Sequence, residues 1–226
     1  MNGFTRLQES SDYVEQREKL RLAEIELLEQ RERVAAMRRA LPGGAVVDDY
    51  VFLEGPRDLA AGDSPVGEVR LSELFTAPGR SLIVYHLMYG KAQTSACPMC
   101  TRWIDGFNAV AHHVEQNANF VVVAAADPAT LRAHARSRRW DRLRLLSCGD
   151  NTFKYDLKSE DGDGSQDSTV SVFSRDESGA VHHVYTAHPW ISDETRERGI
   201  DQLCPMWHLL DLTPQGRGDW YSQLQY

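Results

Sequence analysis

The chain has 226 residues, with 25 Lys and Arg against 33 Asp and Glu, so its formal net charge is −8 at pH 7. A hydrophobic fraction of 42% with 26% charged residues is typical of a folded protein and excludes collagen-like and wholly disordered chains. Because Lys and Arg are not clustered, the composition argues against binding to nucleic acid or to an anionic membrane surface.

The most apolar segments predict no membrane span. Residues 81–89 and 120–126 are much shorter than the roughly 20 residues that cross a bilayer. The first residues, 1–6, continue into a charged segment rather than an apolar one, so no secretory signal is visible. We therefore expect a cytoplasmic protein whose four cysteines are not needed as structural disulfides.

An N-terminal helix is predicted over residues 4 to about 40, which are rich in Glu, Arg, Leu and Gln and contain no proline. Leu41-Pro42-Gly43-Gly44 ends it. Two interpretations of this arm, residues 1–44, stand side by side: a helix lying on its own domain, or an arm that forms a homodimer. The second follows from a seven-residue repeat made by Tyr13, Leu20, Leu27, Val34 and Leu41.

The remaining residues, 45–226, are expected to form one α/β domain. Extended segments are predicted at 49–53 and 67–71, a helical turn at 72–75, buried strands at 82–88, 120–126 and 143–147, helices at 97–116 and 127–139, a hairpin over 169–174 and 180–186, and a last helix at 203–210. Strands that alternate with helices imply parallel pairing through right-handed crossovers.

The most informative motif is Cys97-Pro98-Met99-Cys100, which follows a predicted strand and opens a predicted helix. The unpaired N–H groups and the dipole at a helix N-terminus favour a thiolate at Cys97. Cys100 follows one turn later on the same face, so it is placed to attack a mixed disulfide at Cys97. The motif therefore predicts that Cys97 attacks and Cys100 resolves.

Other chemistries use the same cysteines. The Cys-x-x-Cys spacing also occurs by chance. In that case the chain is expected to be a thioredoxin-fold binding protein without catalytic activity. Cys97, Cys100, Cys204 and His208 match the ligand spacing of a zinc site. Thr94-Ser95-Ala96-Cys97 matches the Thr-x-x-Cys part of the peroxiredoxin pattern, with Gly90 in place of its proline, and suggests reduction of peroxides.

Further residues near the motif are candidates for supporting roles. His86 lies in the preceding strand, where it is either a core histidine or, with Thr94, an aid to the cysteine chemistry. Trp103 and Asp105 are candidates to line a binding pocket, and Arg102 is a candidate to hold a thiolate by its charge, although each also fits a structural role. Cys148 and Cys204 are interpreted as cysteines without a role in the dithiol chemistry, although Cys204 belongs to the alternative zinc site.

Four segments carry a family resemblance: Asp49-Tyr-Val-Phe52, Leu82-Ile-Val-Tyr-His-Leu-Met88, Cys97-Pro-Met-Cys-Thr-Arg-Trp-Ile-Asp-Gly-Phe-Asn108 and Leu209-Leu-Asp-Leu-Thr-Pro-Gln-Gly-Arg217. They resemble the bacterial family called domain of unknown function 899, whose members are labelled dithiol-disulfide oxidoreductases. The resemblance runs from the N-terminal helix to residue 217. It implies a thioredoxin-like fold with a peroxiredoxin-type N-terminal hairpin extension.

The resemblance also implies an activity, a thiol-disulfide oxidoreductase that acts on a small-molecule or protein substrate without a cofactor. Two positions depart from thioredoxin. Ala96 replaces the tryptophan that precedes the dicysteine, and no proline occurs between residues 129 and 188, where the cis-proline that faces the disulfide is expected.

Overall fold

The computed structural model describes residues 9–149, 151–195 and 198–226. The chain divides into two compact units, and the boundary falls between Pro42 and Gly43. The second unit contains all four cysteines.

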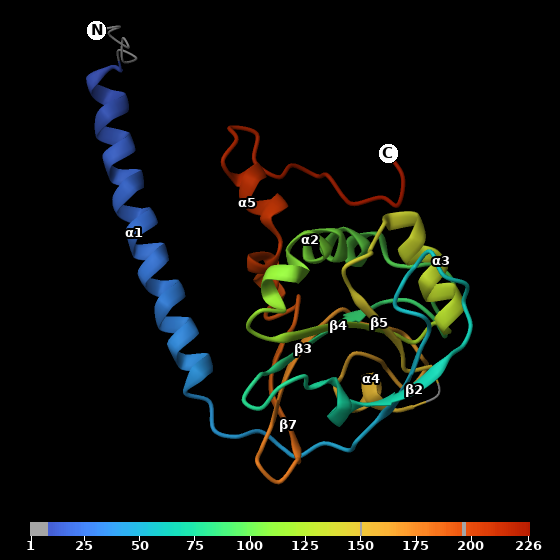
Figure 1. Cartoon of the computed structure of the whole chain (residues 1–226). Helices are drawn as coiled ribbons and strands as arrows, with labels where there is room; N and C mark the ends of the chain where they lie inside the picture. Colours follow the sequence, from blue (N-terminus) through green and yellow to red (C-terminus); the bar gives the residue numbers. More distant parts are fainter. Residues whose placement is uncertain (1–8, 150, 196–197) are drawn as a thin grey trace, which may run out of the picture. The chain divides into compact units, whose positions relative to one another are not determined.

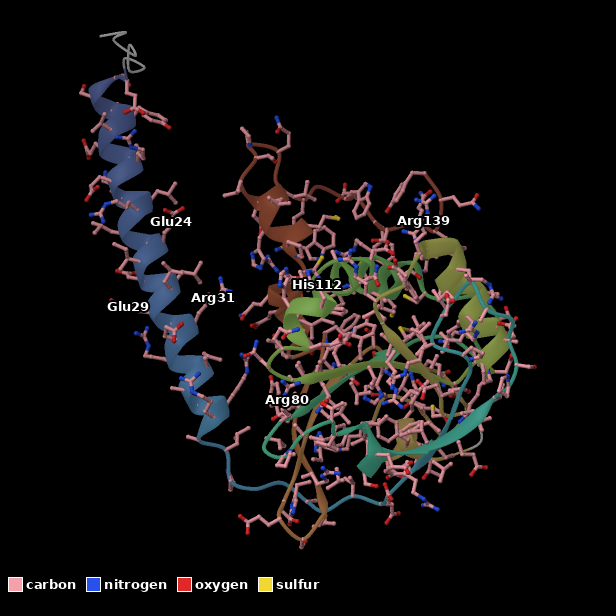
Figure 2. The ribbon with its side chains drawn as sticks, in the orientation of Figure 1. Glu24, Glu29, Arg31, Arg80, His112 and Arg139 are labelled. Atoms are coloured by element: carbon pink, nitrogen blue, oxygen red, sulfur yellow. The ribbon has the colours of Figure 1, made fainter. Side chains whose placement is uncertain are left out.

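The first unit is built around one helix, α1 (Ser11–Arg39). Ser10 caps it by accepting a hydrogen bond from the Tyr13 backbone N–H at 3.2 Å. Charged side chains such as Glu24 and Arg31 project from it (Figure 2), and no residue of the helix is buried. The predicted helix is thus confirmed over 11–39, whereas residues 4–8 lie outside the described part of the chain.

The second unit contains a seven-stranded sheet with the order β2-β1-β5-β4-β3-β6-β7. The strands are β1 (Val51–Glu54), β2 (Gly67–Arg70), β3 (Leu82–Leu87), β4 (Asn119–Ala124), β5 (Arg144–Ser147), β6 (Val170–Arg175) and β7 (Val181–Ala187). All of them fall within a few residues of the predicted segments. β3 and β4 are nearly continuous apolar runs, and turn-forming residues separate β1 from β2 and β6 from β7.

The pairing of the strands defines the fold. β3, β4 and β5 are parallel neighbours, and β6 and β7 form an antiparallel hairpin joined to the other side of β3. The order β4-β3-β6-β7, with a helix between β3 and β4, is that of the thioredoxin-like fold. The β1–β2 hairpin extends the sheet through antiparallel pairing of β1 with β5. The predicted fold and its N-terminal hairpin extension are therefore confirmed.

Helices cover both faces of this sheet (Figure 1). α2 (Pro98–Val114), α3 (Pro128–Arg138) and α5 (Pro205–Asp211) lie on one side, and α4 (Phe153–Asp156) lies on the other. Because side chains alternate along a strand, Tyr85 and Leu87 pack beneath α2 while Val84 faces Phe153 and the 3₁₀ helix η1 (Leu71–Leu74). The sequence did not predict α4, whose four residues are too few for a helical repeat.

The strand β3 and the start of α2 fix the position of the dicysteine. The Cys97 backbone N–H donates to the Met88 carbonyl at 3.1 Å, and Pro98 occupies the first turn of α2, where its missing N–H has no helical partner to lose. Trp103, Ile104 and Ala111 form the buried face of α2. The helices of the described chain are too short or too polar to reach across a lipid bilayer.

Candidate functional site

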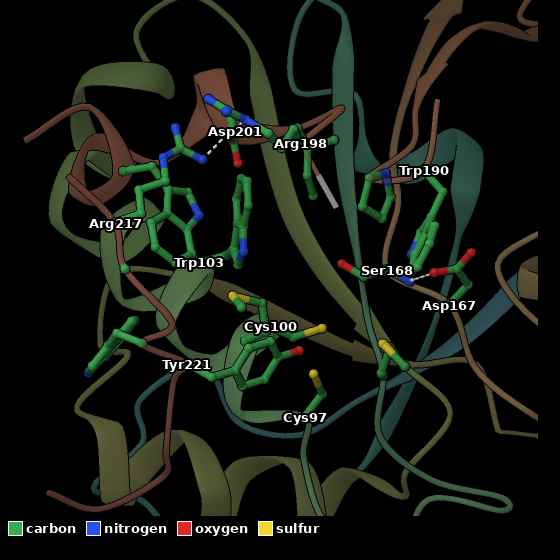
Figure 3. Close-up of a pocket in the computed structure, with 17 residues that line it drawn as sticks. Cys97, Cys100, Trp103, Asp167, Ser168, Trp190, Arg198, Asp201, Arg217 and Tyr221 are labelled. Carbon is green, nitrogen blue, oxygen red and sulfur yellow. Dashed lines mark hydrogen bonds and ion pairs between the residues drawn. The ribbon is translucent and has the colours of Figure 1, made fainter. Parts of the chain in front are cut away.

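A pocket of about 540 Å³ opens at the N-terminal end of α2 (Figure 3). Its walls come from α2, from the residues just before β6, from those just after β7, and from α5 with the segments on either side of it. The lining residues are Met88, Cys97, Met99, Cys100, Trp103, Asp167, Ser168, Pro189, Trp190, Arg198, Ile200, Asp201, Trp207, Arg217, Gly218, Trp220 and Tyr221. A volume of this size suits a small ligand.

Both cysteines of the motif line the pocket as free thiols. Cys97 is the N-cap residue of α2 and is partly exposed, whereas Cys100 is 1% exposed. The two side chains are within hydrogen-bond reach of each other. One turn of helix therefore places them as the sequence predicts, with the more accessible sulfur first.

The acidity of the pair differs from the expectation. The pKa of the Cys97 thiol is raised by the hydrogen bond between Cys97 and Cys100 and by burial. Burial opposes ionisation of Cys100 as well, but hydrogen bonds from Cys97, Tyr85 and the Met88 backbone outweigh it and lower the pKa of the Cys100 thiol. Backbone N–H groups at the start of α2 also favour the thiolate of Cys97, but its hydrogen bond to Cys100 and its burial outweigh them, so the contacts favour the first thiolate on Cys100.

Tyr85 and Ser168 are site residues that sequence reasoning missed. Their hydroxyls hydrogen-bond to each other at 2.9 Å in a buried position, and both also reach the Cys100 thiol. Ser168 lies two residues before β6, where thioredoxins carry the cis-proline. The absence of that proline was visible in the sequence, but nothing there showed that a hydroxyl would face the sulfur.

His86 lies on the opposite face of the sheet from the dicysteine. Its Nε2 is 3.0 Å from the Ser171 hydroxyl, and its ring stacks on Phe153 at 5.3 Å. Burial holds the pKa of His86 well below its usual range. Because neighbouring residues of a strand point to opposite faces, Tyr85 rather than His86 reaches the cysteines. The geometry therefore fits the core-histidine interpretation.

Of the other predicted residues near the motif, only Trp103 lines the pocket. Thr94 is exposed in the loop before Cys97 and does not contribute to the lining. Asp105 bonds Arg138 and accepts the Trp140 indole N–H at 2.8 Å, so it joins α2 to the end of α3 and the residues after it. Its contacts are structural ones.

Arg102 is held between aromatic rings instead of facing solvent. Its guanidinium lies 5.2 Å from the Trp103 ring and 4.7 Å from the Trp207 ring, and it contacts the sulfurs of Met99 and Cys204. Arg102 therefore supports the aromatic wall of the pocket.

The zinc set suggested by spacing is not assembled. Cys204 is buried against Arg102, and His208 is exposed on α5. Among the described residues, no group of three or more His, Cys, Asp or Glu side chains is arranged to hold a metal ion.

The far wall of the pocket is charged but internally paired. Asp201, which is buried, binds Arg198 at 3.0 Å and also binds Arg217, and Arg217 reaches Asp211 at 2.7 Å. The Arg217 guanidinium lies 5.0 Å from the Trp207 ring. These ion pairs fix the wall, and their charges balance one another.

A buried lysine lies near the site on the α4 side. Lys154 is fully buried and donates to the Leu87 carbonyl at 2.9 Å, at the end of β3 just before Met88. Burial lowers the pKa of Lys154 to about 8, while the charges of Cys148 and Cys100 act in the opposite direction. No sequence motif marked this residue.

The fold and the site define a thioredoxin-like protein with a dithiol at the start of its crossover helix. The sequence matches the family described as bacterial protein of unknown function, DUF899, over residues 4–225, so the chain belongs to this family. No curated protein matches the sequence.

Several solved structures are similar in their backbone. A mutant PrxQ from Xylella fastidiosa is 13% identical, with a TM-score of 0.49 and coverage of 72% of this chain and 93% of that one. The peroxidoxin BcpB from Mycobacterium tuberculosis is 21% identical, with a TM-score of 0.46 and coverage of 72% and 94%. Thioredoxin peroxidase I from Plasmodium yoelii is 12% identical, with a TM-score of 0.47 and coverage of 80% and 100%.

Proposed function

We propose that the chain is a thiol-disulfide oxidoreductase whose redox centre is Cys97 with Cys100. The observation that carries the proposal is the pair of adjacent free thiols on the wall of a pocket, one accessible and one buried among hydrogen-bond donors. The peroxide alternative is less well supported, because the Thr94 hydroxyl that it places beside the thiol does not line the pocket.

The reaction follows from the shared proton of the pair. The Cys100 thiolate takes the proton of Cys97, and the Cys97 sulfur attacks one sulfur of a substrate disulfide and expels the other as a thiolate. Cys100 then attacks Cys97, forms the internal disulfide and releases the second substrate thiol, which leaves with the shared proton. Two electrons pass from the dithiol to the substrate, and an external thiol donor restores the dithiol.

Trapping of the free thiols tests this proposal. The protein is equilibrated with glutathione mixtures of defined potential, alkylated and analysed by mass spectrometry. We expect a reversible disulfide between Cys97 and Cys100 that Cys97→Ser and Cys100→Ser abolish. Cys148→Ser is the matched control, because burial raises the pKa of Cys148 to about 11 and the residue does not line the pocket.

One result would overturn the proposal: a dithiol that stays reduced at every potential tested. Elemental analysis separates the metal-binding alternative, which requires about one zinc per chain. The proposed chemistry also suits the reducing cytoplasm, where cellular thiols keep such a pair in its dithiol form.

A further inference from the structure

The C-terminal segment, residues 217–226, is held beside the dicysteine by hydrogen bonds and side-chain contacts. Arg217 is bonded to Asp211 and Asp201, and the Leu224 carbonyl accepts a hydrogen bond from Arg138 on α3 at 3.2 Å. Ser222, only 3% exposed, contacts the sulfur of Met99, the residue just before Cys100. Figure 1 shows the segment in red as it leaves α5. It is therefore an ordered wall of the site.

This wall adds aromatic rings to the pocket. Trp220 packs edge-on against Trp207 at 6.0 Å, and Tyr221 lies beside the two cysteines in Figure 3. With Trp103 and Trp190, these residues line the pocket that contains the dithiol, and their rings are suited to stacking on a flat, apolar group.

The charged side chains that line the pocket form ion pairs with other protein side chains, so none of them requires a charged ligand as its partner. Arg198 and Arg217 are paired with Asp201 and Asp211, and Asp167 is paired with His188 at 2.5 Å. Each of these arginines already has a carboxylate partner, so the paired groups present no net charge to a substrate. The wall is therefore matched to a neutral substrate.

From these contacts we infer that the C-terminal segment makes the site selective for disulfides of small, uncharged aromatic thiols and closes it to protein disulfides. The inference rests on the proposed function and specifies its substrate class. The reaction is the one given above: the dithiol monoanion and the aromatic disulfide yield the internal disulfide, one aromatic thiol and one aromatic thiolate.

Three disulfides serve as probes: 4,4′-dithiodipyridine, which is neutral and aromatic, hydroxyethyl disulfide, which is neutral and aliphatic, and insulin. The protein is reduced with dithiothreitol and freed of it before either small disulfide is added, because dithiothreitol itself reduces 4,4′-dithiodipyridine rapidly. A single turnover is then followed, and only the insulin assay contains dithiothreitol. In the parent protein we expect a saturable rate with the aromatic probe, a rate proportional to concentration with the aliphatic one, and no reduction of insulin above the dithiothreitol background.

The double variant Trp220→Ala/Tyr221→Ala should lose the saturation. Its rate constant for the aromatic probe should fall roughly tenfold, since each aromatic contact is worth roughly two- to tenfold, while the aliphatic rate changes little. Removal of residues 219–226 should in addition permit reduction of insulin. Tyr155→Ala is the control, because Tyr155 is exposed on α4 outside this pocket.

The possible failures are distinguishable. A parent protein that forms no disulfide between Cys97 and Cys100 removes the proposed function itself. The second failure concerns selectivity. If the dithiol is active but the ratio of the aromatic to the aliphatic rate is the same in the parent protein and in the double variant, the C-terminal segment does not make the site selective. Thermal unfolding of each variant confirms that the comparison is made on folded protein.

Discussion

Lys154 places a cationic side chain in the interior, with one hydrogen bond to the Leu87 carbonyl. In the folded chain its pKa is about 8, against 10.5 for the free side chain. Below pH 8 the side chain is charged in both the folded and the unfolded chain, so the free energy of unfolding carries the whole penalty of burying the charge. The penalty decreases as the pH rises toward 10.5, because the folded chain then holds Lys154 in its neutral form. Relative to Lys154→Met, the parent protein should gain up to roughly 3 kcal/mol in its free energy of unfolding across that interval.

Urea unfolding of both proteins at several pH values, with a reductant present, measures this difference. Lys19→Met on exposed α1 is the control and should show no such pH dependence. A parent-minus-variant difference that stays constant between pH 8 and 10.5 would show that Lys154 titrates normally.

The Tyr85 hydroxyl is one of the hydrogen-bond donors that favour the thiolate of Cys100 and lower the pKa of that thiol. Tyr85→Phe keeps the ring under α2 and removes a donor to Cys100, so the Cys100 thiolate should be less stable. We expect the pKa of the first ionisation of the pair to rise by roughly one unit, the range for a hydrogen bond to a charged group. The difference in ultraviolet absorbance between the dithiol and disulfide forms, followed against pH, reports this ionisation alone.

Thr94→Ala is the companion variant to Tyr85→Phe. Thr94 is exposed and outside the pocket, so its removal should leave the titration unchanged. A shift with Thr94→Ala and none with Tyr85→Phe would reverse the assignment and support the peroxiredoxin-like arrangement.

At the scale of elements, Asp105 connects α2 with α3 and the residues after it through Arg138 and Trp140. In Asp105→Ala the buried Trp140 indole N–H loses its acceptor, which costs about 1–3 kcal/mol in the free energy of unfolding. The redox potential of the dithiol should stay unchanged, because the carboxylate does not line the pocket. Chemical unfolding and the glutathione equilibrium measure the two quantities. A changed potential at unchanged stability would instead assign Asp105 to the site.

The elements of the domain could be predicted because each depends on local sequence. The apolar runs that become β3 and β4, and the cap and proline that begin α3, act on their immediate neighbours. The walls of the site depend on distant segments. Ser168 and Trp220 join Cys100 only through the sheet and the last helix, and no spacing in the sequence records that contact. The donors at the Cys100 thiol could not be predicted for the same reason, since Tyr85 and Ser168 reach it from β3 and from the residues before β6.

At the scale of the whole molecule, α1 carries apolar residues without a buried position. Leu20 and Leu27 are 58% and 59% exposed and lie on the seven-residue repeat. A helix with such a repeat is stabilised by a second copy that covers it, and we propose that α1 pairs with α1 of another chain. Sedimentation should show a dimer that Leu20→Glu/Leu27→Glu converts to a monomer.

Leu22→Glu introduces the same charge off the repeat, at a residue that is 50% exposed, and should leave the dimer intact. A parent protein that sediments as a monomer at all concentrations would count against pairing through α1.

The distribution of tryptophans gives the molecule a built-in optical signal. Four of its five tryptophans line the pocket, and the fifth, Trp140, is buried and bonded to Asp105. Indole fluorescence is quenched by nearby sulfur and shifts when a ring loses contact with water. The ultraviolet emission of the intact chain should therefore report both the oxidation of Cys97 and Cys100 and the arrival of a ligand, and a Trp140→Phe variant would emit from the pocket alone.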